Sequence, residues 1–522
     1  MIIKALTIEN FKGIREPVRV EFKPITLLFG PNSAGKSTIV QALHYAREVL
    51  DRNNVDVDHV SSADDSFDLG GFRNIVHKHD LNLPIKLKFE FSLSPLADYT
   101  EFLTGTVDNA WIEYEIKWSN FLEAPLVTST TVGLDGEYFG NIVCAEDGKR
   151  ANISDINFQH HLMAHIPPEL LDNVNNKTPV LFLFIVGSVK SGFLDAYNSG
   201  KILELYVNQT TALPRFVSLN IEMRSENAEE EDESSYYGEP SNWEKLNDFL
   251  RIYFTDITNV LRTELKKFRY IGPIRKTPPR VYSPVRSEDE SRWSSGLAAW
   301  DLMYFSTPTF IDNINSWIAG DNRLNTGYRV NLKRYKELDI DGPIYRSIAT
   351  ETFLDDSDVM AGELKMLPEK RRLCLIDESR GIEVQPYDIG IGISQVLPVV
   401  VAAIDKKSDF VIIEQPELHI HPGLQVSLGD LFISQIEDGN KTFILETHSE
   451  HLLLRLLRRI RETHEDELPP DIASLSPEQV SVNYIEPSSD GLRVRQLMIS
   501  EDGDSLGSWP KGFFEERTQE LL

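Results

Sequence analysis

A glycine-bounded loop near the start of the chain carries residues suited to binding phosphate. Residues 30–37 read Gly-Pro-Asn-Ser-Ala-Gly-Lys-Ser and match the pattern G-x-x-x-x-G-K-[S/T]. The glycines let backbone N–H groups turn inward around an anion, and the start of a following helix adds partial positive charge. The positively charged Lys36 ammonium would contact the β- and γ-phosphates, and the Ser37 hydroxyl would ligate Mg²⁺. The sequence therefore predicts an ATP and Mg²⁺ site formed by Asn32, Ser33, Ala34, Gly35, Lys36, Ser37 and Thr38.

Apolar runs elsewhere in the chain predict the strands that must hold this site together. Residues 25–29 form a short apolar run before the loop, and residues 37–50 have a helical pattern after it. A second apolar run, 410–413, ends in Glu414, and a carboxylate at the end of a core strand can orient water on Mg²⁺. A third run, 441–445, is followed by Glu446-Thr447-His448-Ser449. We therefore expect Ser37 and Glu414 as the metal-holding residues.

The remaining patterns divide the chain into a β-rich first part and a less regular middle. Residues 1–22 read as two strands around a turn, and alternation over 85–93, 110–118 and 126–134 predicts an antiparallel sheet. Helical patterns cover 243–268 and 298–318, and an acidic, serine-rich stretch at 226–239 predicts a solvated loop. Strand–loop–helix alternation returns from about residue 373.

Composition narrows the class of protein. The chain of 522 residues has a net charge of −28, which argues against a broad nucleic-acid footprint but leaves room for a local basic stripe. Either Arg275, Arg280 and Arg286 or the run Arg455, Arg458, Arg459 and Arg461 could contact phosphates of a nucleic acid. The second set also fits a charged helix face. Two cysteines without metal-ligand spacing, and no apolar run near ~20 residues, predict a cytoplasmic protein without a membrane segment. His419 and His421 resemble a metal pair, but no third ligand is evident.

The order and spacing of these motifs resemble the ABC-type ATPase heads of the SMC group, and more closely the OLD-like bacterial AAA family ATPases. The resemblance covers roughly residues 1–135 and 370–460, and residues 509–514 resemble part of a C-terminal module of many bacterial members. It implies an α/β fold, a P-loop NTPase head with a mixed core sheet and an antiparallel subdomain, split by a mainly helical insertion. The expected divisions are an N-terminal lobe at 1–135, an insertion at 136–368, a C-terminal lobe at 369–465 and a C-terminal module at 466–522.

The resemblance also implies roles for individual residues. Glu414 would be the Walker B acid, and His448 the switch histidine that contacts the γ-phosphate. Residues 390–395 would be the signature segment, which contacts the ATP of another subunit through Ser394, Gln395 and backbone N–H groups. Residues 417–421 would lie at the dimer interface. Because the signature acts across subunits, a homodimer or higher homo-oligomer around ATP is expected.

The chain departs from the family pattern directly after Glu414. Most such heads place there a glutamate that activates the attacking water, whereas this chain has Gln415. An amide orients water but accepts no proton, and general-base catalysis contributes roughly 10²–10⁴-fold. Either Glu417 reaches the water, or hydrolysis is slow and the ATP-bound dimer is long-lived. We expect a slow ATPase.

Three functions fit these residues. The first is a sensor or regulatory ATPase that controls a separate nuclease or toxin, since the chain resembles the ATPase subunits of Septu-like, retron-associated and PARIS-like anti-phage systems. The alternatives are an OLD-like or an SMC-like ATPase that processes DNA directly. OLD-like nucleases carry a metal-binding acidic domain, whereas only about 60 residues follow the helix after His448, and Asp502-Gly503-Asp504 is too isolated to be a nuclease site. SMC proteins carry long heptad arms, whereas this insertion of about 230 residues is interrupted by prolines.

Overall fold

The structure is a computed structural model, and it describes most of the chain. The described residues are 3–57, 69–93, 107–157, 160, 204–207, 210–214, 221–224, 251–286, 290–349, 362, 364–437, 441–489 and 491–504. The acidic segment at 226–239, residues 243–250 of the first predicted helix and the tail at 509–514 lie outside them.

A six-stranded sheet forms the centre of the molecule. Its order is β11 (Arg269–Ile271), β15 (Phe410–Glu414), β16 (Thr442–Glu446), β3 (Ile25–Phe29), β17 (Val480–Ser488) and β18 (Gly491–Leu497). Neighbours from β11 to β17 run parallel, and β18 pairs antiparallel with β17. All residues of β3 and β16 are buried, as expected for parallel strands covered on both faces. The phosphate loop follows β3, so one strand, β16, separates it from β15.

Helices cover both faces of this sheet because its side chains alternate between two cores. Leu28, Ile412 and Ile444 join the core that contains α1 (Lys36–Asp51) and α7 (Ile257–Lys267). Leu27 and Leu445 join the other core. That second core contains α9 (Leu297–Phe305), α10 (Pro308–Ile318), α13 (Ile391–Ile404), α14 (Pro422–Ile436) and α15 (Glu450–His464).

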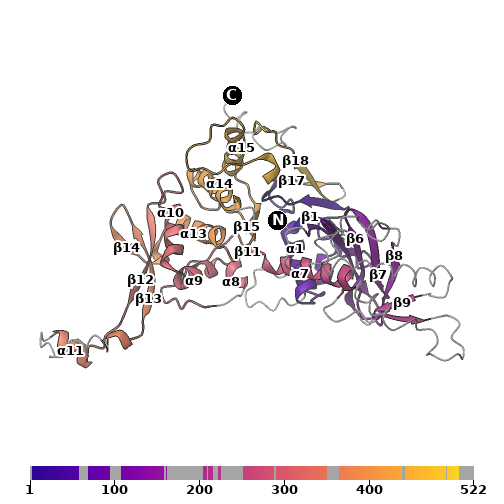
Figure 1. The fold of residues 1–522 in the computed structure, drawn as a ribbon, viewed down its shortest axis with the longest axis horizontal. Coiled ribbons are helices and arrows are strands. Elements are labelled where there is room, and N and C mark those ends of the chain that lie inside the picture. Colours follow the sequence, from indigo (N-terminus) through magenta and orange to yellow (C-terminus); the bar gives the residue numbers. More distant parts are fainter. Residues whose placement is uncertain are drawn as a thin grey trace, which may run out of the picture.

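A nine-stranded antiparallel sheet lies beside the core, at the right in Figure 1. Its order is β10 (Ile221–Arg224), β9 (Glu204–Val207), β8 (Ala151–Ile156), β7 (Glu137–Cys144), β6 (Ala124–Leu134), β5 (Asn109–Ser119), β4 (Ile85–Ser92), β1 (Ile3–Glu9) and β2 (Val18–Glu21). The predicted strands are confirmed, but the sheet continues past residue 135 through β7 and β8. The turn between β6 and β7 has positive φ at Asp135 (46°) and Gly136 (87°), the Asp-Gly hairpin geometry.

A smaller three-stranded sheet of β12 (Tyr328–Tyr335), β13 (Lys370–Asp377) and β14 (Ile382–Val384) extends away from the core in the opposite direction. The helix α11 (Pro343–Ala349) lies beyond it in Figure 1. The helical pattern at 298–318 is two helices rather than one. Ser306 ends α9, and Thr307 caps α10 with Pro308 in its first turn, a position where proline is tolerated.

Short elements complete the described part of the chain. They are α2 (Phe72–Ile75), α8 (Glu290–Ser294), a π-helix at Arg251–Asp256, and 3₁₀ turns at His77–His79, Pro386–Asp388 and Pro477–Gln479. None of the described helices is both long enough and apolar enough to cross a membrane.

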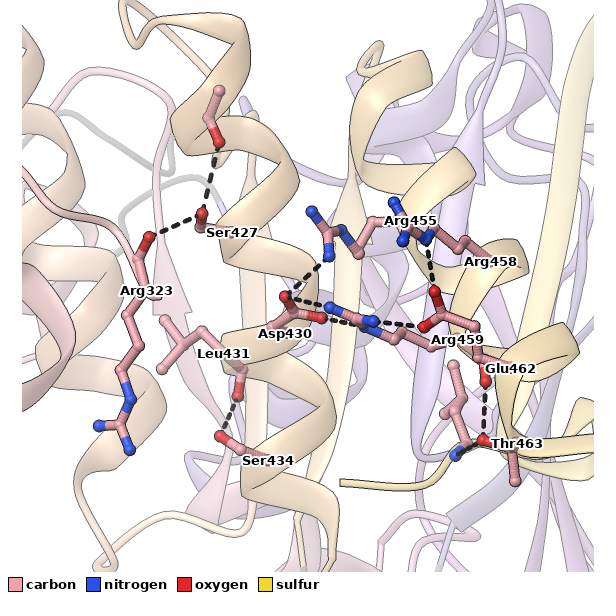
Figure 2. A network of polar contacts seen from close by, with 12 residues as sticks. Arg323, Ser427, Asp430, Leu431, Ser434, Arg455, Arg458, Arg459, Glu462 and Thr463 are labelled. Carbon is pink, nitrogen blue, oxygen red and sulfur yellow. Dashed lines mark hydrogen bonds and ion pairs between the residues drawn. The ribbon is translucent and has the colours of Figure 1, made fainter. Parts of the chain in front are cut away.

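A buried ion network joins α14 to α15 (Figure 2). Arg459 donates two hydrogen bonds to Asp430, at 2.8 and 3.1 Å, and also contacts Glu462. Arg455 lies 3.2 Å from Asp430, and Arg458 donates to Glu462 at 2.6 Å. These arginines were expected to form a charged helix face or to contact a nucleic acid. Arg458 and Arg461 are exposed on the helix, as expected of a charged face, whereas Arg455 and Arg459 hold two helices together.

Together, the mixed core sheet and the antiparallel sheet confirm the predicted α/β fold class of a P-loop ATPase head.

Candidate functional site

The phosphate loop follows β3 and has the backbone geometry of an anion-binding turn. Gly35 has φ of 93° and is the N-terminal cap of α1, and Ser33 has φ of 63°. The positive φ at residue 35 favours glycine, and a Cβ at Gly35 would also lie 2.3 Å from Cδ1 of Leu492, whose side chain would have to move. The Lys36 ammonium donates to the carbonyl oxygens of Gly30 (3.1 Å) and Pro31 (3.0 Å), which holds it over the loop. Burial lowers the pKa of Lys36, although Glu446, Glu417 and Glu414 oppose this.

Two strand-end carboxylates lie beside the loop. Ser37 Oγ donates a hydrogen bond to Glu446 Oε2 at 2.8 Å. Glu446 pairs in register with Glu414 of the neighbouring parallel strand, so both side chains lie at the same edge of the sheet. Burial, together with repulsion from Glu446, raises the pKa of Glu414 to about 7. Burial also raises the pKa of Glu446. Two buried carboxylates side by side favour either a shared proton or a bound cation.

Glu417 and His448 meet at the same edge. The Glu417 carboxylate accepts hydrogen bonds from Thr447 Oγ1 (2.8 Å) and from the His448 backbone N–H (2.7 Å). Burial raises the pKa of Glu417, and these two hydrogen bonds oppose the shift. The exposed His448 ring has its pKa lowered, first by burial and then by Lys36. This shift favours the neutral form of the imidazole.

Gln415 occupies a constrained position between these groups. It has φ of 46°, and its N–H donates to the carbonyl of Glu446 at 2.7 Å. The Arg275 guanidinium donates to the carbonyls of Glu414 (2.6 Å) and Gln415 (3.0 Å). Arg275 is only 2% exposed, so the expectation that it could contact a nucleic acid is wrong. Arg275 follows β11, and its side chain is directed into the core.

The expected signature segment starts α13 but does not expose its polar side chains. Gln395 is buried, and its amide bonds to the backbone of Arg275 through Oε1 (3.2 Å) and Nε2 (2.7 Å). Ser394 is also buried and donates to the Ile391 carbonyl. The predicted nucleotide contact through these two side chains is therefore not what the structure shows. The exposed part of the segment is the helix start at Gly390, next to Ile391, which is 60% exposed.

Two other sequence observations have local explanations. His421 caps α14 by accepting from the Gly423 N–H at 3.2 Å. In the part of the chain that the structure describes, no group of three or more His, Cys, Asp or Glu side chains is placed to hold a metal ion. Arg280 pairs with Asp388 at 2.5 Å, and Arg286 lies over the ring of Phe305.

The residues at the loop nevertheless fit Mg²⁺ in its nucleotide-bound form. Such an ion takes one or two carboxylates, a hydroxyl, water and the phosphates of the substrate rather than a complete protein cage. Ser37, Glu414 and Glu446 supply oxygen donors of this kind, and burial is the first cause of the raised pKa of both carboxylates.

Sequence reasoning missed two members of this group. Glu446 was noted only as part of a motif; its contact with Ser37 depends on the parallel pairing of β16 with both β3 and β15. The signal was present, since two apolar strands both end in glutamate. Arg275 carried no such signal, because its neighbours resemble a basic surface segment.

Solved structures similar to this chain share low sequence identity with it. The SMC head domain from Thermotoga maritima is 9% identical, with a TM-score of 0.37 over 96% of this chain and 100% of that one. The Smc head domain with an extended coiled coil from Pyrococcus furiosus, bound to the C-terminal domain of ScpA, is 10% identical, with a TM-score of 0.36 over 99% and 98%. No curated protein matches the sequence.

Family models give a clearer result. A model described as "AAA domain, putative AbiEii toxin, Type IV TA system" matches residues 225–455. The model described as "AAA ATPase domain" matches residues 1–275, which is more than half of the 522-residue chain. With this match, and with a phosphate loop between β3 and α1 in a parallel core sheet, the chain belongs to the AAA ATPase domain family.

Proposed function

We propose that the protein binds ATP with Mg²⁺ at residues 32–38 and hydrolyses it slowly. The observation that carries this proposal is the meeting of Ser37, Glu446 and Glu414 beside Lys36, which supplies oxygen donors and a cation at one place. Mg²⁺ held there by Ser37, Glu414 and Glu446 would neutralise charge on the phosphates. Lys36 would add its own charge, and the neutral His448 ring would meet the outermost phosphate.

Slow hydrolysis follows from the residues available as a base. Gln415 can orient water but cannot take its proton. Glu417 is the nearest alternative, and its raised pKa suits a proton acceptor. However, its two oxygens already accept hydrogen bonds from Thr447 and His448, which reduces their basicity. These contacts favour a nucleotide-binding switch over a fast motor.

The first experiment measures ATP binding, phosphate release and mass for the wild type and for Lys36→Ala. The wild type should bind ATP·Mg²⁺ and release phosphate well below the roughly 1 s⁻¹ of an ordinary enzyme. Lys36→Ala should lose binding. Arg329→Ala, which removes an exposed ion pair on β12, is a control that should change neither. Unchanged ATP binding in Lys36→Ala would refute the proposal.

Gln415→Glu tests why hydrolysis is slow. A carboxylate at this position should accelerate turnover by roughly 10²-fold, the lower end for general-base catalysis. Glu417→Gln should slow whatever turnover remains. If Gln415→Glu is no faster than the wild type, the missing base does not limit the rate.

The same proposal includes an ATP-dependent homodimer. The start of α13 presents backbone N–H groups next to Ile391, and nearby Tyr387 (54%) and Ile274 (77%) are also exposed. Such a surface suits contact with the ATP of a second subunit. Light scattering should show a dimer or higher oligomer with ATP·Mg²⁺, and a monomer for Lys36→Ala. A mass that does not depend on ATP would contradict this arrangement.

We also infer a regulatory role, exerted in the cytoplasm on a separately encoded nuclease or toxin, as in the anti-phage systems that the motifs resemble. The description of the second matching family names a putative toxin of a Type IV TA system, so the role of a controller of a separate effector rests on the motif resemblance. Direct action on DNA has less support, because Arg275, Arg455 and Arg459 are engaged inside the fold. Co-purification with the product of an adjacent gene, dependent on ATP and lost in Lys36→Ala, is the result expected. Equal capture by Lys36→Ala would oppose the switch.

The lobes at 1–135 and 369–465, the insertion at 136–368 and the module at 466–522 remain our proposed division of the chain.

A further inference from the structure

A second cavity, separate from the phosphate loop, lies at the far end of α1. It encloses about 800 Å³ and is lined by the last turns of α1, the end of α7, β11, α9 and the segment before β15. Lys36 and Arg47 are on the same helix, and at 1.5 Å per residue they are about 16 Å apart. This volume is within the ~300–1,000 Å³ typical of small-molecule sites.

The cavity is basic although the chain is acidic. Seven Lys or Arg side chains and three Asp side chains line it, in a protein of net charge −28. Two of the three acids are already neutralised: Asp405 pairs with Arg269 at 2.5 Å, and Asp301 pairs with Arg292 at 2.5 Å. Three of the seven cations are paired as well, Arg52 with Glu48, Lys267 with Glu264 and Arg269 with Asp405, so the lining keeps a positive excess somewhat smaller than the simple difference.

Several of these cations have no carboxylate to balance them. Lys266, Lys407 and Arg286 form no ion pair with any residue that the structure describes, and all three are exposed toward solvent. Arg47 is buried, and its pKa is lowered to about 10, first by burial and then by Arg52, although Asp51 and Glu48 oppose this. Lys266, Lys407 and Arg286 are the exposed cations of the lining that an anionic ligand can reach.

Aromatic rings hold two of the guanidinium groups against the wall. Arg269 lies 3.8 Å over the ring of Trp293, and Arg286 lies 4.6 Å over the ring of Phe305. A guanidinium stacked on a ring can still direct its in-plane N–H groups at two oxygens of a phosphate. Arg269 already donates to Asp405, so Arg286 is the stacked arginine that can bind a phosphate in this way. Arg47 similarly lies 4.8 Å over Phe268. The cavity thus combines oriented phosphate donors with apolar walls.

From the size, charge and stacked arginines of this cavity we propose that it binds a nucleoside polyphosphate, in addition to the nucleotide at the phosphate loop. The ligand's phosphates would contact Arg286, Lys266 and Lys407, and its base would occupy the apolar part near Trp293 and Phe305. The elements that line the cavity also lead to the phosphate loop, because α1 begins at Lys36 and β15 ends at Glu414. A ligand here is therefore positioned to influence the ATP site.

The test counts ATP molecules bound per chain by equilibrium dialysis at physiological salt. The wild type should bind two, Lys36→Ala one, the double charge reversal Lys266→Glu/Lys407→Glu one, and the combination of all three none. Loss of two charged contacts should weaken the cavity site at least about tenfold. The matched control, Lys149→Glu/Lys365→Glu, makes the same change of net charge at exposed lysines elsewhere and should still bind two.

These outcomes separate the two sites. If the wild type binds one ATP and Lys36→Ala none, the cavity proposal is wrong while the phosphate-loop site stands. If the wild type and Lys36→Ala both bind one, the phosphate-loop proposal fails and the cavity stands. Arg286→Glu is a second variant that should also remove cavity binding, with thermal unfolding confirming that each protein is folded. If 5′-phosphorylated (dT)₈ binds Lys36→Ala and ATP does not, the cavity takes a nucleic-acid strand, and the small-molecule assignment is overturned.

Discussion

Glu414 and Glu462 are each 8% exposed, and burial raises the pKa of both, but their net pKa shifts are in opposite directions. The pKa of Glu462 is lowered, because hydrogen bonds from Arg458 and Arg459 outweigh the effect of burial. The pKa of Glu414 is raised to about 7 by burial and by the charge of Glu446. The first carboxylate has its partners within the fold. The second lies in register with another acid, Glu446, and the cation that we propose there would come with the nucleotide.

The difference separates charges that hold the structure from charges that serve a ligand. In Figure 2 both carboxylates of the α14–α15 network, Asp430 and Glu462, contact two arginines each. At the strand ends, by contrast, Glu414 and Glu446 face each other across neighbouring strands, with Ser37 and Lys36 at the loop. Perturbed carboxylates of the second kind are typical of functional sites.

The largest expected effect is on stability, in the paired network. Asp430→Ala leaves Arg455 and Arg459 without their shared partner, and breaking a buried pair by removing one side destabilises a protein by about 3–5 kcal/mol. Denaturant unfolding would measure this loss. ATP affinity at temperatures where the variant is folded should remain that of the wild type.

A double-mutant cycle sharpens this prediction. Asp430→Leu combined with Arg459→Met removes the central pair from both sides, so the double variant should lose less stability than the sum of the single variants. Simple additivity would show that the two residues do not interact energetically, and the network would then not be the joint between α14 and α15.

Next in size is an effect on catalysis, in the unpaired cluster. Glu414→Gln removes a metal-holding carboxylate and should lower kcat by roughly 10²-fold. Stability should not fall, because the variant also removes a repulsion with Glu446. Steady-state phosphate release and thermal unfolding, measured on the same preparation, check both parts. A variant that is unstable but catalytically normal would show that Glu414, like Glu462, stabilises the fold and does not act on a ligand.

A smaller effect is expected at Arg275, which combines features of both classes. It is a buried cation, but it acts on backbone carbonyls of Glu414 and Gln415 and on α13 through Gln395. Arg275→Lys keeps the charge but loses the planar guanidinium that donates to these carbonyls. Because Glu414 would then be misplaced, kcat should fall about tenfold, while KM for ATP changes little. Arg329→Lys is the control at an exposed pair and should leave kcat unchanged. A change in KM alone would indicate a role in binding rather than positioning.

The strands of the ATP site could be predicted because apolar runs with defined ends indicate buried parallel strands. That reasoning located Lys36, Ser37 and Glu414 correctly at one edge of the sheet. The register between strands was not visible in the sequence, and register is what places Glu446 on Ser37. The strands after residue 135 were not predicted, although Asp135-Gly136 is a typical hairpin turn and indicates that a further strand follows.

Side-chain direction was the other limit. Arg275 and Gln395 both carry polar groups that sequence reasoning assigned to ligands, one to nucleic acid and one to ATP. Instead, the Gln395 side-chain amide and the Arg275 backbone are hydrogen-bonded to each other inside the fold. Whether a polar residue at an element's end turns in or out depends on tertiary contacts, and no spacing rule contains that information.

The smallest expected effect follows the pKa of Glu414 and tests the comparison directly. A carboxyl whose pKa is raised on folding binds more protons in the folded state than in the unfolded state between its two pKa values. Stability therefore falls as pH rises from about 4.5 to about 7, and Glu414→Gln avoids that loss. With EDTA present, the variant's melting temperature should match the wild type at pH 5 and exceed it by about 2 °C at pH 8.

Glu462→Gln should behave in the opposite sense, because its carboxyl has a lowered pKa and stabilises the fold when ionised. Its melting temperature should fall below that of the wild type at neutral pH, and the deficit should shrink as the pH drops through the lowered pKa. Adding ATP·Mg²⁺ should reverse only the result for Glu414→Gln, since a cation bound at the strand ends makes the Glu414 carboxylate favourable. If both variants instead show differences that do not change with pH or Mg²⁺, the two carboxylates are alike, and the strand-end pair is not a cation site.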